Sequence, residues 1–190
     1  ASASFADNFG STPSYGADGA GSVSSAYTLS VVAATDSGLT DVATGEAVLL
    51  RMNGAVVEGY TETSDDVVFT VGVSGAGLVT LDQIRAIDHG DDANDHDASL
   101  SLTTDAITLT RTDTITDGDG DTAQNSANIT LGTNLNFEDD GPSITVTATA
   151  AADSLTVDET VLATNASASF ADNFGSTPSY GADGAGSVSS

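Results

Sequence analysis

The sequence predicts an all-β fold, an immunoglobulin-like β-sandwich that forms one domain of a tandem array. Apolar and β-branched residues alternate with small polar residues over short runs, which is the period expected of half-buried strands. No segment has a sustained helical period. About ten candidate strands, spaced roughly 8–15 residues apart, are typical of a sandwich.

The candidate strands are separated by Gly, Asp, Asn and Ser, as turns require. Asn53-Gly54 lies between two strand-like runs and predicts a tight hairpin. Residues 80–87 are the most helix-like stretch, so the run 78–87 could hold a helical turn. The predicted strands are Tyr27–Val32, Ala47–Met52, Val56–Thr61, Val67–Val73, Leu78–Ile87, Ser99–Leu102, Ala106–Thr114, Ala127–Leu131, Ser143–Ala148 and Ser154–Val157.

The core of such a domain must be built from aliphatic side chains. Only 5% of the residues are aromatic and there is no tryptophan, so Val, Leu, Ile and Ala supply most of the buried surface. We expect Phe5, Phe9, Phe69 and Phe137 to be the large core side chains. A 165-residue repeat is long enough to bury a core of this kind.

An exact internal repeat sets the organisation of the chain. Residues 1–25 and 166–190 are identical at all 25 positions, so the repeat period is 165 residues. Solenoid repeats are only about 20–50 residues long, so this period corresponds to a whole domain. Exact identity indicates recent duplication, and we expect the parent protein to carry further copies.

The acidic run Glu138-Asp139-Asp140, followed by Gly141-Pro142, marks the predicted boundary between repeats. Residues 1–141 would then form a sandwich body that lacks its first strands, and residues 142–190 would open the next repeat. A junction near Asn165 is the alternative, but it would leave a 25-residue stub that should fray. The first division requires residues 142–190 to pack on something, such as the open edge of a neighbouring copy by head-to-tail strand exchange, in cis or in trans.

The charge balance restricts the partners of the chain. There are 28 acidic residues and three arginines, and the net charge is −25. Without the two acids of the duplicated segment, one period carries 26 − 3 = 23 net negative charges. Such a chain repels nucleic acid and anionic membranes, and a long array of it would expand unless cations neutralised it. There is no cysteine, and bound metal is the usual substitute for disulfides.

The sharpest motif is Asp117-Gly118-Asp119-Gly120-Asp121. Alternating Asp and Gly brings the carboxylates of Asp117, Asp119 and Asp121 together in a tight turn, where they repel one another unless a cation lies among them. Clustered hard oxygen ligands favour Ca²⁺. A solvated acidic turn is the alternative interpretation.

A second calcium site is predicted at the linker. Its candidate ligands are Glu138, Asp139 and Asp140, together with Asp158 and Glu159 after the next predicted strand. Strand ends at one pole of a sandwich can bring these groups together, and an ion there would fix the angle between domains. A polar linker with an exposed strand end is the alternative.

Two further acidic segments are weaker candidates. Residues 88–97 hold His89 and His96 among acids, but without a recognised zinc spacing, and a solvated loop is the favoured interpretation. For Asp18-Gly19-Ala20-Gly21, with Asp7 upstream, a turn is favoured over an ion site.

Nothing in the sequence indicates an enzyme. There is no cysteine, no Gly-x-Ser-x-Gly motif and no phosphate-binding loop, and the paired carboxylates occur in clusters suited to cations. A glycan- or protein-binding module is the second hypothesis. It would need an exposed aromatic platform, for which Tyr15, Tyr27, Tyr60 and Tyr180 are few.

Four segments carry a family resemblance. They are Leu155–Thr160 (LTVDET), Ser14–Gly21 (SYGADGAG), Ile107–Ala123 (ITLTRTDTITDGDGDTA) and Asn136–Pro142 (NFEDDGP). In these segments the chain resembles the extender repeats of large RTX (repeats-in-toxin) adhesins of Gram-negative bacteria. The resemblance implies type I secretion, attachment at the outer membrane and a position at the cell surface.

The same resemblance implies a structural role. Tandem β-sandwich domains of that family project a ligand-binding tip in adhesion and biofilm formation, and calcium at the domain junctions makes the stalk rigid. It therefore implies ligand roles for Asp117, Asp119, Asp121, Asp139 and Asp140, and also for Asp158 and Glu159. The implied partners are neighbouring repeats of the same polypeptide, without nucleic acid and without direct membrane insertion by this segment.

Overall fold

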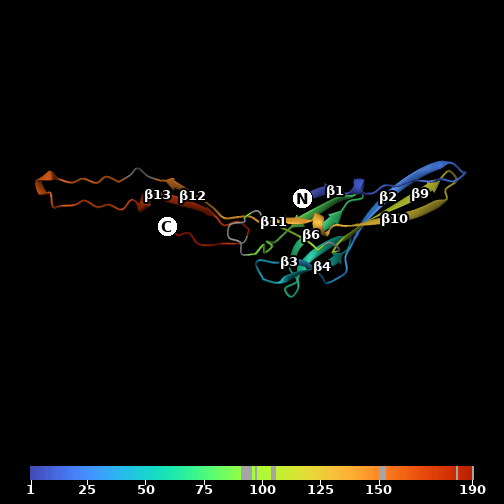
Figure 1. The fold of residues 1–190 in the computed structure, drawn as a ribbon, viewed down its shortest axis with the longest axis horizontal. Coiled ribbons are helices and arrows are strands. Elements are labelled where there is room, and N and C mark those ends of the chain that lie inside the picture. Colours follow the sequence, from blue (N-terminus) through green and yellow to red (C-terminus); the bar gives the residue numbers. More distant parts are fainter. Residues whose placement is uncertain (91–95, 97, 104–105, 150–152, 183, 190) are drawn as a thin grey trace. The chain divides into compact units, whose positions relative to one another are not determined.

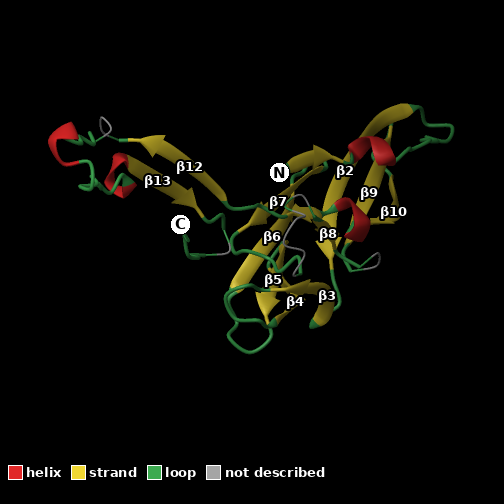
Figure 2. Cartoon of the chain, turned by 60° about the vertical axis from the view of Figure 1, so that its left-hand side comes forward, coloured by secondary structure: helices red, strands yellow, loops and turns green. Residues whose placement is uncertain are grey.

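The structure is a computed structural model that describes residues 1–90, 96, 98–103, 106–149, 153–182 and 184–189. The chain divides into two compact units, Ala1–Asp139 (unit 1) and Asp140–Ser190 (unit 2). All of the strand pairs are antiparallel, and the few helices described are single 3₁₀ turns, which confirms the predicted all-β class (Figure 2). That unit 2 opens the next repeat stays a prediction.

Unit 1 is built on a six-stranded sheet with the order β1-β7-β6-β5-β4-β3. Figure 1 labels β1, β3, β4 and β6 of this sheet. Strands β3 to β7 form a meander in which each strand pairs with the next, while β1 comes from the start of the chain and pairs with β7. The strands are β1 (Ser2–Ser4), β3 (Thr35–Thr40), β4 (Ala47–Asn53), β5 (Val56–Thr61), β6 (Val67–Val73) and β7 (Leu78–Gln83).

A second sheet of unit 1 has the order β10-β9-β2 and consists of long strands. These are β2 (Ala20–Ser30), β9 (Thr108–Asp117) and β10 (Thr122–Thr130). A short third sheet pairs β8 (Ser99–Ser101) with β11 (Asn136–Glu138), and the 3₁₀ turns of this unit are η1 (Ala6–Asn8) and η2 (Gly132–Asn134).

All three sheets of unit 1 contribute buried side chains to its core, as expected for a sandwich. Phe69 of β6 and Phe137 of β11 are 0% and 1% exposed, and their ring centroids lie 5.0 Å apart. Leu109 of β9 is also fully buried. Phe5 and Phe9 pack against this core while remaining partly exposed. The four phenylalanines expected in the core therefore all contact it.

The described part of unit 2 has no comparable core. Its sheet there pairs β12 (Ser143–Ala148) with β13 (Phe174–Ser179), and its 3₁₀ turns are η3 (Glu159–Val161) and η4 (Ala171–Asn173). Every buried apolar side chain among the described residues belongs to unit 1. In unit 2 the only buried residue of the described part is Asn173.

Several strand predictions agree closely with the structure. The predicted bounds of β5, β6 and β12 are those observed, and β4 extends the prediction by one residue. Asn53 pairs with Val56, which leaves a two-residue loop, and Gly54 adopts a φ of 61° there. The predicted tight hairpin is therefore present.

Other predictions were wrong. Residues 154–157 are not a strand, and β7 ends at Gln83 without a helical turn after it. Strands β2 and β10 begin at Ala20 and Thr122, seven and five residues before the predicted starts. These extensions are rich in Ser, Asn and Gln and are exposed, so they carry no apolar alternation and their strand character comes from pairing with β9.

In the described part of the chain, no helix has the length and apolar character that a membrane span needs.

Candidate metal centre

The β9–β10 turn organises its own acidic groups. The N–H group of Asp117 donates to the backbone oxygen of Asp121 at 3.0 Å, which closes the turn. The Oδ1 atom of Asp117 accepts hydrogen bonds from the N–H groups of Gly120 (3.1 Å) and Asp121 (2.8 Å). Gly120 has a φ of 102°, a value that strongly favours glycine. The alternating Asp-Gly pattern is thus a defined turn.

The loop before β2 lies against this turn. The N–H group of Gly118 donates to the backbone oxygen of Gly19 at 3.1 Å. A Cβ atom on Gly118 would lie 2.3 Å from the backbone oxygen of Asp18, so only glycine allows this approach. The register between β2 and β9 shifts at Gly21, where a Cβ atom would lie 2.2 Å from the oxygen of Thr116.

These two loops bring three carboxylates together. One carboxylate oxygen from each of Asp18, Asp117 and Asp119 lies within 4.8 Å of the other two. Asp117 is half-buried, while Asp18 and Asp119 are exposed. The pKa of Asp117 is lowered by a hydrogen bond with the Asp119 carboxyl group and by the backbone N–H groups of the turn. The charged form of Asp117 is therefore favoured.

The donor set of this triad fits a hard divalent cation. Three carboxylates offer oxygen ligands only, without the imidazole or thiolate that would favour zinc. Calcium takes about 6–8 oxygens in flexible geometry, so the exposed side of the triad would leave positions for water or backbone carbonyl groups. The geometry can accommodate Ca²⁺, with Asp18, Asp117 and Asp119 as its carboxylate ligands.

The triad differs from the set predicted from the sequence. Asp121 contributes its backbone to the turn, and its carboxylate does not belong to the group. Asp18 takes that place, although its segment was favoured as a simple turn. The position of Asp18 follows from the register between β2 and β9. Because Ala20 pairs with Asp117, the residues before Ala20 lie beside the β9–β10 turn.

The predicted linker ligands have separate surroundings. In unit 1, Glu138 ends β11, and the N–H group of Asp139 donates to the backbone oxygen of Ala98 at 2.8 Å. An oxygen of Asp139 lies 3.6 Å from Nδ1 of His89. Among the described residues, neither acid joins a group of three possible ligands.

In unit 2, Asp140 accepts hydrogen bonds from the N–H group of Ala182 at 3.0 and 3.1 Å. Asp158 caps η3 by accepting from the N–H group of Thr160 at 2.8 Å, and hydrogen bonds from Thr160 lower the pKa of Asp158. Glu159 is exposed in η3. A shared ion at the linker stays a prediction.

The histidine-containing loop is only partly described, since residues 91–95 and 97 lie outside the described residues. The side chain of His89 is 4% exposed, and its Nε2 atom lies 3.0 Å from the backbone oxygen of Phe137. A fully solvated loop is therefore wrong at His89, which is held against β11.

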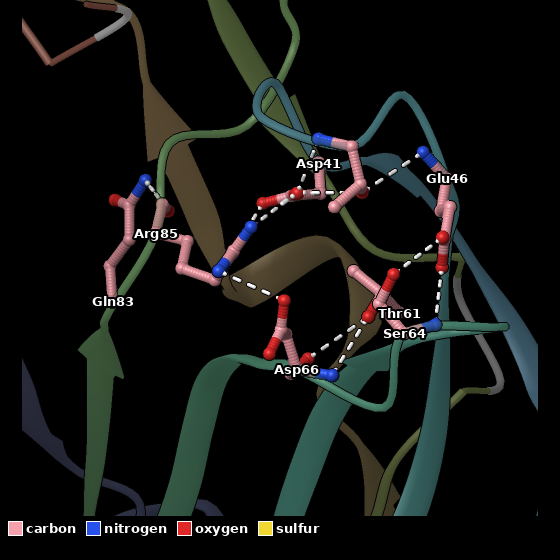
Figure 3. Close-up of polar contacts among 8 residues, drawn as sticks. Asp41, Glu46, Thr61, Ser64, Asp66, Gln83 and Arg85 are labelled. Atoms are coloured by element: carbon pink, nitrogen blue, oxygen red, sulfur yellow. Dashed lines mark hydrogen bonds and ion pairs between the residues drawn. The ribbon is translucent and has the colours of Figure 1, made fainter.

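An ion pair between the buried Asp41 and Arg85 connects loops at one end of the six-stranded sheet (Figure 3). The sequence did not indicate this pair. Asp41 is 0% exposed and accepts hydrogen bonds from Nε and Nη2 of Arg85 at 2.8 and 2.9 Å. The backbone and hydroxyl groups of Thr44 donate to the same carboxylate. Arg85 first, and Thr44 after it, lower the pKa of Asp41 against the opposing effect of burial.

Arg85 also joins two hairpin loops. Its Nη1 atom lies 3.2 Å from Asp66, in the β5–β6 loop, while Asp41 begins the β3–β4 loop. The side chain of Glu46 accepts hydrogen bonds from Ser64 across the same two loops (Figure 3). Both oxygens of Asp41 are already engaged by protein donors, so this network stabilises the fold and does not offer a ligand site.

Comparison with known proteins assigns the larger part of the chain to a protein family. Residues 1–130 match a family described as a domain of unknown function, DUF5801. The chain belongs to the DUF5801 family. The matched region includes the Asp triad and the strands β1 to β10 of this DUF5801 domain. No curated protein matched the chain, and no solved structure did.

Proposed function

We propose that this DUF5801 chain is a structural extender domain in the stalk of a giant bacterial surface adhesin. The observation that carries the proposal is the exact repeat of 25 residues at a period of 165, because a repeat of domain length supports an array of whole domains. The array would stand outside the cell, anchored at the outer membrane after type I secretion. It would project a distal ligand-binding tip for adhesion and biofilm formation.

Calcium would give this stalk its stiffness. Asp18, Asp117 and Asp119 would hold the ion between the loop before β2 and the β9–β10 turn, two segments about a hundred positions apart in the sequence. When bound, the ion supplies the positive charge that three clustered carboxylates lack. With 23 net negative charges per period, cation binding also reduces the repulsion between successive domains.

A second ion is proposed at the linker, with ligands drawn from Glu138, Asp139, Asp140, Asp158 and Glu159. The acidic run Glu138–Asp140 spans the division between the two units. An ion bound there would restrict the hinge between domains, whereas the ion at the triad would act within one domain.

The alternative is a glycan- or protein-binding module. Two of the four tyrosines are already engaged within unit 1: the guanidinium of Arg51 lies 4.2 Å from the ring centroid of Tyr60, and Tyr27 lies against Phe9. This leaves Tyr15 and its repeat equivalent Tyr180, which favours the extender role. A glycan array separates the two hypotheses, since an extender domain should bind no glycan on it.

The experiment that tests the proposal uses the chain in calcium and in EDTA. At a 100-fold excess of calcium over Kd, linkage predicts a rise of about 8 °C in the Tm of a domain of this size. Small-angle scattering of two consecutive repeats should show a longer, narrower distribution of lengths in calcium. An unchanged Tm and an unchanged scattering profile in EDTA would refute the calcium-stiffened stalk.

A further inference from the structure

The two identical segments of the chain share one 3₁₀ turn and differ in structure on both sides of it. We call residues 1–25 the first copy and residues 166–190 the second copy. Phe9 (φ −118°, ψ 135°) and Phe174 (φ −121°, ψ 136°) are equivalent and have nearly equal dihedral angles, and each follows a 3₁₀ turn of sequence Ala-Asp-Asn. After this point the second copy forms β13, whereas residues 9–14 of the first copy form no strand.

The difference lies in the availability of a pairing partner. Strand β13 pairs along its whole length with β12, and the ladder continues as the N–H group of Thr149 donates to the backbone oxygen of Asn173 at 2.8 Å. Residues 10–14 have no backbone–backbone hydrogen bond to any described residue. The sequence equivalent to β12 would lie 165 residues earlier, before the first residue of the chain.

Beside residues 9–14 runs a groove of about 270 Å³ over the second sheet of unit 1. The lining of this groove includes an apolar row, in which Val23 of β2 and Ala123 of β10 both pair with Ile115 of β9. Val23 is 39% exposed. The long strands of this sheet therefore extend beyond the core and carry apolar side chains that nothing in the described part of unit 1 covers fully.

The register of unit 2 shows which side chains would fill this groove. Ile144 pairs with Pro178 and Val146 with Ser176, and their first-copy equivalents are Pro13 and Ser11 (178 − 165 and 176 − 165). Directly opposed residues of an antiparallel pair point to the same face. Ser11 and Asp113 both line the groove, and the Ser11 side chain, after those of Arg111 and Ser25, helps to lower the pKa of Asp113. With the Ser11 side chain directed toward the groove, the equivalents of Ile144 and Val146 would face the groove as well.

The apolar side chains of β12 are exposed in unit 2. Ile144 is 52% and Val146 62% exposed in unit 2, and they lie on the same face of β12 with Ala148. The threonines Thr145 and Thr147 occupy the other face, so β12 has the apolar alternation of a strand with one buried side. Among the residues that the structure describes, unit 2 supplies no sheet for that side to cover.

We propose that unit 1 is a sandwich with one strand missing, and that its missing strand is a copy of residues 143–148 supplied by the preceding repeat. Paired with residues 9–14 in the register seen between β12 and β13, that strand covers the row of Val23, Ile115 and Ala123. Conversely, the first copy shows β1 paired with β7, a partner that the second copy lacks in this chain. Each copy thus forms one of the two strand pairs expected in a complete domain: β1 with β7 in the first copy, and β13 with β12 in the second. This inference does not depend on calcium.

The test extends the full chain with an additional copy of residues 142–165 placed directly before Ala1. The added residues then precede the first copy just as residues 142–165 precede the second copy. Hydrogen exchange is followed at residues 9–14, with all samples in EDTA. The extension should slow exchange at alternate amides of this segment by about 100-fold, since they become ladder donors, and should raise the Tm of unit 1 by about 5 °C.

The control carries Ile144→Asp and Val146→Asp in the added copy only, which leaves unit 1 and the original β12 unchanged. It should lose the protection and the rise in Tm. Unchanged exchange in the extended chain would overturn the proposal, and equal protection in the control would overturn the register and the apolar face. Because calcium is absent throughout, neither result bears on the ion proposed at the Asp triad.

Discussion

The first and second copies are 25 identical residues in two different environments. In the first copy, residues 2–4 form β1 against β7, and Phe9 packs on Tyr27 with ring centroids 6.0 Å apart. In the second copy, the equivalents of β1 are not a strand, Phe174 is 60% exposed, and the strand β13 forms instead. The Phe9 ring therefore packs against the core in the first copy, while its equivalent in the second copy is exposed.

Pairing partners, and not local sequence, therefore decide the structure of this segment. The 3₁₀ turn forms in both copies because it is local, whereas each strand forms only where its partner is present in the chain. Neither copy shows a complete set of neighbours.

The largest expected effect is a fall in the Tm of unit 1, the unit that holds the buried core. Arg85→Met leaves Asp41 buried without its charged partner, and we expect the Tm of unit 1 to fall by about 10 °C. The matched control is Arg51→Met, which removes a guanidinium paired with the exposed Asp65 and the more buried Glu58. Thermal melts should show a clearly smaller loss for Arg51→Met. Equal losses would contradict a special role for the Asp41–Arg85 pair.

The two equivalent phenylalanines give the most direct contrast between the copies. Phe9→Ala removes a ring that contacts the core and Tyr27, and we expect the Tm of unit 1 to fall by about 6 °C. Phe174→Ala removes the same ring from a site where it is 60% exposed, and should leave that Tm within about 1 °C. If both variants melted alike, the copies would not differ in the way the structure shows.

Acid should affect unit 1 through the same ion pair. The folded-state pKa of Asp41 lies below its ordinary value of 3.8, so the carboxylate contributes stability that is complete above this value. That contribution is lost as the pH falls from about 4 through the lowered pKa. The Tm measured between pH 5 and pH 2 should decline less steeply in Arg85→Met, whose Asp41 has lost the main cause of its shift. Parallel profiles would count against this assignment.

The smallest effect concerns the ion at the triad. Asp18→Asn removes one of three carboxylates, and should reduce the calcium-dependent rise in Tm by about half, or about 4 °C. Asp7→Asn removes an exposed carboxylate from the same copy outside the triad and should leave the rise intact. An equal response of the two variants to calcium would mean that the triad is not the site.

Much of the fold was predictable where side chains alternate between core and solvent. Strands β5 and β6 were predicted with their observed bounds because Val57 and Val71 are buried between exposed or half-buried neighbours. The long polar parts of β2 and β10 carry no such pattern, since they pair with β9 while facing solvent. Their strand character depends on a partner far away in the sequence.

The candidate site was predictable only in part, for the same reason. Asp117 and Asp119 belong to one turn, and the Asp-Gly alternation was sufficient to select them. Asp18 joins them through the pairing of β2 with β9, and Asp41 meets Arg85 over 44 positions of sequence. Contacts of this range follow from the sheet order, which periodicity alone does not specify.

If each sandwich is completed by a strand of the preceding copy, an engineered disulfide can report the register of that strand. The chain has no cysteine, so two can be introduced without competition. In the extended chain, Thr12→Cys is combined with Thr145→Cys in the added copy, because Thr145 pairs with Thr177, the equivalent of Thr12 (177 − 165). Opposed residues of a ladder lie within the Cα separation that a disulfide needs.

The reference protein combines Thr12→Cys with Thr147→Cys, which shifts the pair by two residues out of register. Oxidation should close an intramolecular disulfide in the first protein, detected by mass and by mobility on a non-reducing gel, and much more slowly in the second. Equal rates in the two proteins, or no intramolecular bond in either, would contradict completion of the sandwich by this strand.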